Sequence, residues 1–291
     1  MGTVVQIDRY RVREHLPQES KAVDDSIPLW LYPQVLSLDA PAVAVCWQWL
    51  FAKSFHVATS PLVPLLTGVS VWMIYVADHM LDVRDGAVYS ARHRFVQRHR
   101  QSLTAIMALT ATVAAIASLF LPIPILRGGI ELAGIVLGYM AAVHVSRRKL
   151  LRYWPKELVI GLVFAAGASL ATWTNSPAVA HAWPAILIFA AICTLNCAAL
   201  DGWEWRSHRL ISRYPHRLTR WIARHFSIAA IAALIAAAAL LVRARNPVAL
   251  ALGASVLMMM GVARLRHRLS PDTLRLMFDA TLLTPLFFLL R

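Results

Sequence analysis

"PLVPLLTGVSVWMIYVADHMLDVRDG", residues 61–86, begins as an apolar run and ends in three aspartates. The apolar part has about the 20 residues that an α-helix needs to cross the hydrocarbon core of a bilayer. We therefore expect a membrane-spanning helix over 61–81. A carboxylate in or beside the hydrocarbon core is costly, so carboxylates placed there usually serve a function. Asp78, Asp82 and Asp85 are accordingly candidate site residues.

Apolar runs of this kind recur along the whole chain. Of its 291 residues, 58% are hydrophobic and 15% are charged, and the mean hydropathy is +0.57. This composition is too apolar for a soluble domain, so we expect an all-α polytopic membrane protein. A cytoplasmic arm over 1–40 would precede a transmembrane domain over 41–291. Nine spans are predicted, at 41–59, 61–81, 102–123, 126–145, 155–174, 179–200, 221–242, 247–263 and 272–290. Eight spans are the alternative, because Lys53 and His56 interrupt the first run and the eighth is short.

The basic residues are distributed unevenly between the two sets of loops. All but five of the 29 Lys and Arg residues fall on one side of the predicted spans, the exceptions being Lys53, Arg127, Arg243, Arg245 and Arg291. The positive-inside rule then places the N-terminus and the aspartate motif in the cytoplasm and the C-terminus outside. We expect an integral protein of a bacterial-type inner membrane. The net charge of +14 follows from this topology, so no nucleic-acid partner is expected.

A second acidic motif ends the sixth predicted span, in "NCAALDGWEW" at 196–205. Asp201 and Glu204 are three residues apart, and helical spacing puts Asp78, Asp82 and Asp85 on roughly one face. Carboxylates gathered so closely repel one another unless cations compensate. Mg²⁺ prefers oxygen ligands and is commonly held by one or two carboxylates together with substrate phosphates. We therefore predict a Mg²⁺–diphosphate site with five metal ligands, Asp78, Asp82, Asp85, Asp201 and Glu204, of which all except Asp85 are also candidate catalytic residues.

Four further residues are candidates for binding the diphosphate. Arg92 and Arg94 follow the first motif, Lys156 opens the fifth predicted span, and Asn196 precedes the second motif. A simpler interpretation is that the acids pair with neighbouring arginines at the membrane interface. His79 is expected to face away from the line of Asp78 and Asp82 and to serve packing. Packing is also the expected role of the three cysteines, Cys46, Cys193 and Cys197.

The chain has nine predicted spans, an acidic motif closes the second span and another closes the sixth, and the fifth opens with "WPKELVIGLVFAAG" at 154–167. In these three features it resembles the UbiA superfamily of intramembrane prenyltransferases. The resemblance covers roughly residues 40–290. It implies a helical bundle around a central cavity, with a prenyl diphosphate bound through Mg²⁺ between the two motifs. The first motif departs from the family pattern because Asp78 stands where the family typically has Asn and Asp85 comes one residue early. The second departs because Trp205 stands where the family has a further acid and the tyrosine that often precedes the motif is missing.

The expected function is therefore that of a Mg²⁺-dependent intramembrane enzyme. It would ionise a prenyl diphosphate and transfer the prenyl group to an aromatic or lipid acceptor, with membrane lipid as its surroundings. The resemblance also admits a terpene cyclase, in which the allylic cation is captured by the substrate's own double bonds. A cation-coupled transporter and an inactive homologue are the further alternatives.

Overall fold

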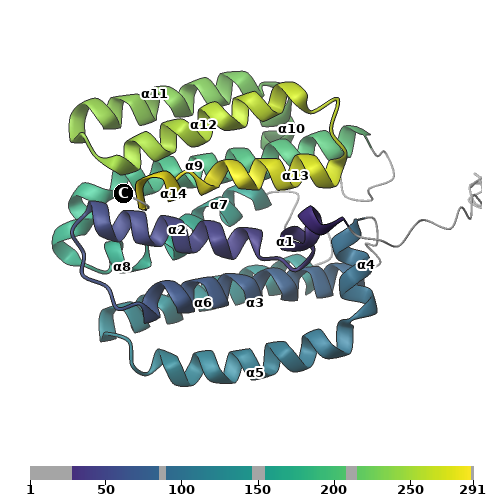
Figure 1. Cartoon of the computed structure of the whole chain (residues 1–291), viewed down its shortest axis with the longest axis horizontal. Helices are drawn as coiled ribbons and strands as arrows, with labels where there is room; N and C mark the ends of the chain where they lie inside the picture. The colour runs from purple at the N-terminus through teal and green to yellow at the C-terminus, as the bar shows by residue number, and fades with distance from the viewer. Residues whose placement is uncertain (1–27, 85–89, 146–154, 208–214, 290–291) are drawn as a thin grey trace, which may run out of the picture.

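The computed structural model describes residues 28–84, 90–145, 155–207 and 215–289, and these segments contain helices and no strands (Figure 1). In chain order the helices are η1 Leu29–Leu31, α1 Tyr32–Val35, α2 Asp39–Ser54, α3 Leu62–Arg84, α4 Ala91–Arg98, α5 Arg100–Ser118, α6 Ile123–Val145, α7 Lys156–Ala168, α8 Leu170–Trp173, α9 Ser176–Ser207, α10 Arg217–Arg224, α11 Phe226–Ala244, α12 Pro247–Leu265, α13 Pro271–Ala280, η3 Thr281–Leu283 and α14 Leu286–Leu289.

Six of these helices are long and apolar enough to cross a membrane, namely α3, α5, α6, α9, α11 and α12. They correspond to six of the nine predicted spans. The other three predicted runs are broken. The first, 41–59, is helical only as far as Ser54, where α2 ends. Together with the segment Leu29–Val35, which lies outside the predicted run and meets α2 at 73°, α2 is long and apolar enough for one bent span. The fifth is divided between α7 and α8 at Ser169, and the ninth turns into a 3₁₀ segment after Ala280. The structure thus supports an all-helical membrane protein with six candidate spans, or seven with the bent pair.

The outer helices expose apolar side chains. Among the residues of α5 only Leu103 is buried, although the mean hydropathy of the helix's most apolar part is 1.5, and Ile106, Leu109 and Val113 are exposed along it. In water such a surface would be an aggregation-prone patch. Surrounding lipid removes that cost, which is consistent with an integral membrane protein.

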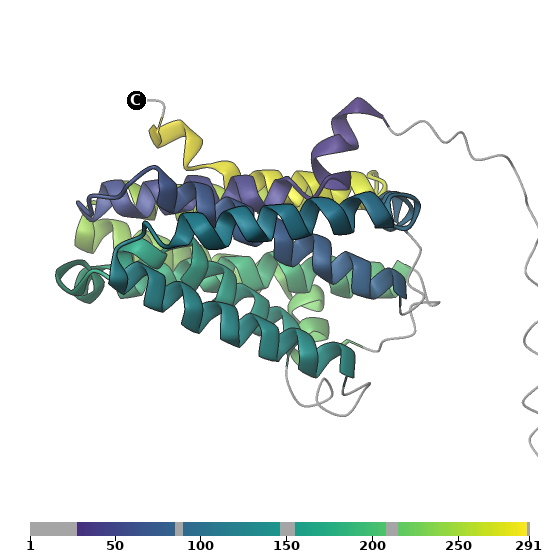
Figure 2. The same cartoon turned by 90° about the horizontal axis from the view of Figure 1, so that it is seen from below.

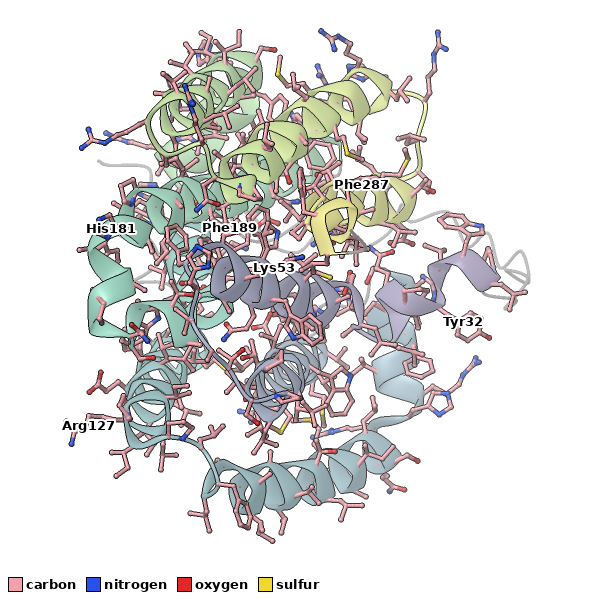
Figure 3. The ribbon with its side chains drawn as sticks, turned by 60° about the vertical axis from the view of Figure 1, so that its left-hand side comes forward. Tyr32, Lys53, Arg127, His181, Phe189 and Phe287 are labelled. Atoms are coloured by element: carbon pink, nitrogen blue, oxygen red, sulfur yellow. The ribbon has the colours of Figure 1, made fainter. Side chains whose placement is uncertain are left out.

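The core forms around α9, the longest helix, which contacts α7, α10, α11, α12 and α13. Phe189 of α9 is fully buried and stacks on Trp47 of α2, with 4.2 Å between the ring centroids. Trp47 also donates a hydrogen bond from Nε1 to the Leu282 carbonyl oxygen, at 2.8 Å. Figure 3 shows Phe189 inside the bundle, whereas Arg127 projects from its edge. Trp47 of α2 therefore links the central helix α9 to η3, near the C-terminal end of the described residues.

The helices begin at Leu29, inside the range expected for the N-terminal arm. Leu31 and Val35 are buried, so this segment packs on the bundle. Ser37 connects α1 to α2 with φ 57°, in the left-handed region. This conformation, uncommon for a residue other than glycine, turns the chain sharply between the two helices.

The described elements richest in arginine gather at one end of the bundle. Helices α4 and α10, with three arginines each, lie at the right-hand end in Figure 1, together with the turn between α12 and α13, while α14 lies towards the other end. In the perpendicular view of Figure 2 the long helices again run side by side. Among the described residues, the arginines of α4, α10 and the turn between α12 and α13 thus lie at one end. Which side of the membrane that end faces stays a prediction.

Candidate functional site

The second acidic motif is positioned by unusually close packing of α7 and α10 on α9. A Cβ at Gly161 of α7 would meet the Thr194 Oγ1 atom and come within 2.8 Å of the Ala190 carbonyl oxygen. A Cβ at Gly202 of α9 would similarly meet the Cβ of Ala223 on α10. The absence of side chains at these two glycines lets the helices approach. The approach brings Lys156, the first residue of α7, over Asp201 of α9.

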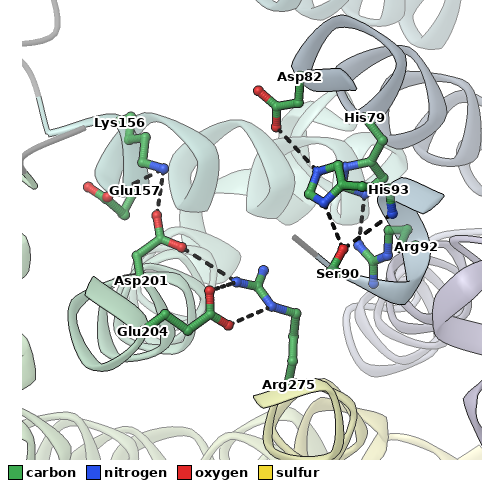
Figure 4. Close-up of polar contacts among 10 residues, drawn as sticks. All are labelled: His79, Asp82, Ser90, Arg92, His93, Lys156, Glu157, Asp201, Glu204 and Arg275. Atoms are coloured by element: carbon green, nitrogen blue, oxygen red, sulfur yellow. Dashed lines mark hydrogen bonds and ion pairs between the residues drawn. The ribbon is translucent and has the colours of Figure 1, made fainter. Parts of the chain in front are cut away.

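We call Lys156, Glu157, Asp201, Glu204 and Arg275 the charged cluster (Figure 4). The Lys156 Nζ atom lies 2.5 Å from Asp201 Oδ2. Arg275 of α13 forms a two-pronged hydrogen bond with Glu204, from Nε to Oε1 at 3.1 Å and from Nη2 to Oε2 at 2.7 Å. Its Nη2 atom also lies 3.8 Å from Asp201 Oδ1. Three helices that are distant in sequence thus each contribute to one network.

Glu157 is the most deeply buried member of the charged cluster, with 2% of its surface exposed. Its Oε2 atom accepts a hydrogen bond of 2.7 Å from the Thr219 hydroxyl of α10, and its Oε1 atom lies 4.0 Å from Lys156 Nζ. By contrast, the side chains of Lys156 and Arg275 are 40% and 32% exposed. The two cations are therefore more exposed than the carboxylates with which they pair.

We call His79, Asp82, Ser90, Arg92 and His93 the histidine cluster; it joins α3 to α4. Ser90 caps α4 by accepting a hydrogen bond from the His93 backbone N–H, and its Oγ atom lies 2.7 Å from His93 Nδ1. The other ring nitrogen of His93 lies 4.0 Å from Asp82 Oδ2. Arg92 donates hydrogen bonds to His79 Nε2, at 2.8 Å, and to the buried Asp39, at 3.0 Å.

The two clusters lie in one region of the structure. Figure 4 draws them in a single close-up, with Lys156, Glu157, Asp201 and Glu204 on its left and His79, Ser90, Arg92 and His93 on its right. The two sequence motifs are therefore brought to the same part of the bundle by the fold.

The predicted site residues have different places in the structure. Asp78 and Asp82 are half-buried on α3, and Asp201 and Glu204 are half-buried on α9. Asp85 lies outside the described residues. Three of the four predicted diphosphate ligands do not face the second acidic motif. Arg92 is buried against Asp39 and His79, and Arg94 is exposed on α4. Asn196 is buried and donates a hydrogen bond to the Phe278 carbonyl oxygen.

Several residues of these clusters were not among the sequence candidates. Arg275 was counted only as part of a basic loop, because its 71-residue separation from Glu204 gives no local signal. His79 was expected to face away from Asp82, but one ligand atom from each of His79, Asp82 and His93 lies within 4.8 Å of the others. His93 belongs to α4, and hydropathy does not predict that α4 packs against α3. Of the three cysteines, which are expected to serve packing, Cys193 belongs to the main hydrophobic core.

An apolar pocket of about 410 Å³ opens beside the histidine cluster. It is lined by α3, α4, α5 and the link between α1 and α2, and its lining includes Trp72, Val76, Val96 and Leu103. Val76 and Val96 are each three residues from His79 and His93, respectively, and so lie one helical turn away on the same face. A volume of this size is typical of small-molecule sites.

Comparison of the chain with protein-family models, curated proteins and solved structures gives no match.

Proposed function

We propose that this protein is an intramembrane enzyme that binds a prenyl diphosphate between the charged cluster and the histidine cluster. A divalent cation, with Mg²⁺ as the first candidate, would assist ionisation of the substrate, and the prenyl group would pass to an aromatic or lipid acceptor. The resemblance of the two acidic motifs to the UbiA superfamily is part of this proposal.

The observation that carries the proposal is the pairing of Lys156 and Arg275 with the second acidic motif. Both cations are partly exposed and come from different helices, and an arginine fork suits a phosphate as well as a carboxylate. Their charge would stabilise the negative charge that develops on the leaving diphosphate. The simpler interpretation is that the acids form ordinary surface ion pairs at the membrane interface. Such pairs would not require cations from two different helices to converge on half-buried carboxylates at the end of a third helix.

The charge of the site also supports a divalent cation. Within the charged cluster, two cations face the three carboxylates of Glu157, Asp201 and Glu204. A diphosphate would add further negative charge, so more positive charge must enter with it. Because Lys156 and Arg275 already occupy Asp201 and Glu204, we place the cation nearer Asp78 and Asp82. When bound there, it would polarise the diphosphate and help the leaving group depart.

The rest of the substrate needs an apolar surface. The 410 Å³ pocket next to the histidine cluster provides one and is lined in part by α5, most of whose apolar residues are unburied. We propose that the first isoprene units of the substrate occupy this pocket. Its apolar lining would also keep water from an allylic cation.

Nine membrane crossings also belong to the proposal. The six candidate spans would be joined by three broken crossings, made by α1 with α2, by α7 with α8, and by α13 with α14. Such interrupted helices are tolerated where their polar backbone groups face protein or a cavity rather than lipid. The breaks would then serve the site, since α7 and α13 carry Lys156 and Arg275.

The test is an assay of diphosphate release by the purified full chain in nanodiscs. Prenyl diphosphates of several lengths are offered with and without Mg²⁺, and with and without extracted membrane lipids and small phenols as acceptors. The organic products are extracted and identified. We expect release that requires a divalent cation and an acceptor, together with a prenylated product.

Release without an acceptor, accompanied by a cyclic hydrocarbon or alcohol, would identify a terpene cyclase instead. No release with any substrate would overturn the enzymatic proposal. Gradient-driven flux of cations into proteoliposomes would then favour the transporter, and its absence the inactive homologue.

A further inference from the structure

The histidine cluster contains more nitrogen ligands than a magnesium site needs. His79 and Asp82 lie on α3 and His93 lies on α4, and one ligand atom from each of the three lies within 4.8 Å of the other two. Two imidazoles with one carboxylate form a donor set typical of iron, cobalt or zinc, whereas Mg²⁺ prefers oxygen alone. The three residues are half-buried or buried, at the end of the bundle where the charged cluster also lies.

We propose that His79, Asp82 and His93 bind a divalent transition-metal ion of the Zn²⁺, Fe²⁺ and Co²⁺ class. The inference deepens the proposed function, since it names the cation class of the same site, and it rests on that function only for the role of the ion. Three protein ligands leave coordination positions open for water or for a phosphate oxygen.

Ser90 orients one of the ligands. If the His93 Nδ1–H group donates to Ser90 Oγ, 2.7 Å away, the lone pair of Nε2 faces Asp82. A ligating histidine typically donates its second ring N–H in this way, which fixes the tautomer and the ring orientation. Since Ser90 is also the N-cap of α4, the start of that helix and the aim of His93 are fixed by the same side chain.

Arg92 already holds one ring nitrogen of His79. Its Nη1 atom donates to His79 Nε2, while its Nη2 atom donates to Asp39. Ligation of the ion through Nε2 would replace the first of these hydrogen bonds and leave the second in place. Metal–ligand bonds of about 2.0–2.2 Å put tetrahedral ligand atoms roughly 3.3 Å apart, so the side chains must close by about 1 Å. With Asp39 and Asp82 facing one arginine, the charge of the cluster favours a cation.

The test is titration of the chelator-treated full chain with Co²⁺, read by its visible ligand-field absorption in the absence of any prenyl diphosphate. We expect one Co²⁺ per chain and at least about tenfold weaker binding in His79→Ala and in His93→Ala, with a smaller loss in Ser90→Ala. His181→Ala is the matched control and should bind Co²⁺ like the wild type. His181 is exposed near the start of α9 (Figure 3), which lies at the opposite end of the bundle from α4 in Figure 1.

Arg92→Gln separates ligation from a merely structural effect. It removes the competing positive charge, so the proposal predicts Co²⁺ binding several-fold tighter than in the wild type, whereas a damaged fold would bind it more weakly. Failure to bind Co²⁺, equal binding by the His79 and His93 variants, or displacement of Co²⁺ by equimolar Mg²⁺ would overturn the inference.

The outcome is independent of the enzyme assay. Mg²⁺-dependent diphosphate release that needs Asp82 but neither histidine, with no Co²⁺ bound, would keep the proposed function and overturn this inference. Histidine-dependent Co²⁺ binding without diphosphate release under any metal would keep the inference and overturn the proposed function.

Discussion

Arg275 is the residue on which the charged cluster most depends. It contacts both Glu204 and Asp201, from a helix that has no other cation in this network among the described residues. Replacement by alanine leaves two half-buried carboxylates without this partner. We expect Arg275→Ala to lower the free energy of unfolding by about 1–3 kcal/mol, since uncompensated buried groups cost this much. Thermal unfolding in detergent, followed by circular dichroism, measures the change.

The control for this variant is Arg268→Ala. Arg268 is exposed in the turn before α13 and carries the same charge, so its removal should change stability by no more than about 0.5 kcal/mol. Equal melting temperatures of the two variants would show that the Arg275 fork contributes nothing to the fold.

Lys156 has a different expected effect, because it is the more exposed cation and lies directly on Asp201. Lys156→Met keeps most of the apolar stem and removes the charge. Its effect on stability should be small, while diphosphate release should fall by a factor of about 100, as when one charge-stabilising group is removed from a transition state. Lys156→Arg should recover part of the rate. A rate unchanged in Lys156→Met would exclude a role for this cation.

At the scale of residues, the sequence predicted the acids better than their partners. Asp78, Asp82, Asp201 and Glu204 could be singled out because a carboxylate near the end of an apolar run is conspicuous on its own. Arg275 and Glu157 could not, because an arginine in a basic loop and an acid beside a lysine each have a simpler local explanation. Only the fold brings α13 and α7 to the end of α9.

At the scale of elements, the packing of α7 on α9 determines where Lys156 lies. We expect Gly161→Ala to lower stability by about 1–3 kcal/mol, since the added methyl group would press on Thr194 and the Ala190 carbonyl oxygen. Gly167→Ala, on the same helix, adds its methyl group to open space. It should be neutral or stabilising by up to about 1 kcal/mol, because alanine favours the helix. Thermal unfolding of both variants provides the comparison, and a Gly161→Ala variant as stable as Gly167→Ala would contradict the close packing.

Hydropathy predicted where apolar segments lie but not where helices break. The six candidate spans correspond to predicted runs, whereas the runs at 155–174 and 272–290 are divided in the structure and the helix in 41–59 ends at Ser54. A window average cannot detect a bend at Ser37 or an interruption at Ser169, because neither changes the mean apolarity. The same limit explains why His79 and His93 were not associated, since the chain must turn back between α3 and α4 to bring them together.

At the scale of the whole molecule, the positive-inside rule predicts orientation. Arg94→Cys and Arg127→Cys place single thiols at exposed positions on opposite sides of the predicted topology. In intact spheroplasts a membrane-impermeant maleimide should label Arg127→Cys and should label Arg94→Cys only after lysis. The wild type is the control, because its three cysteines are buried or half-buried within the bundle. The reverse pattern would contradict the predicted orientation.

The central claim is that the two acidic motifs, distant in sequence, act on one diphosphate. The most direct test is the rate of diphosphate release by the wild type and by Asp82→Asn, Asp201→Asn and Glu131→Gln, in the same nanodiscs and at saturating divalent cation. Glu131 is an exposed acid of α6 and serves as the control. We predict that each aspartate variant loses at least about 99% of the rate, as expected for groups that act as a unit, while Glu131→Gln retains it. Full activity in either aspartate variant, or no release by the wild type, would contradict a shared site.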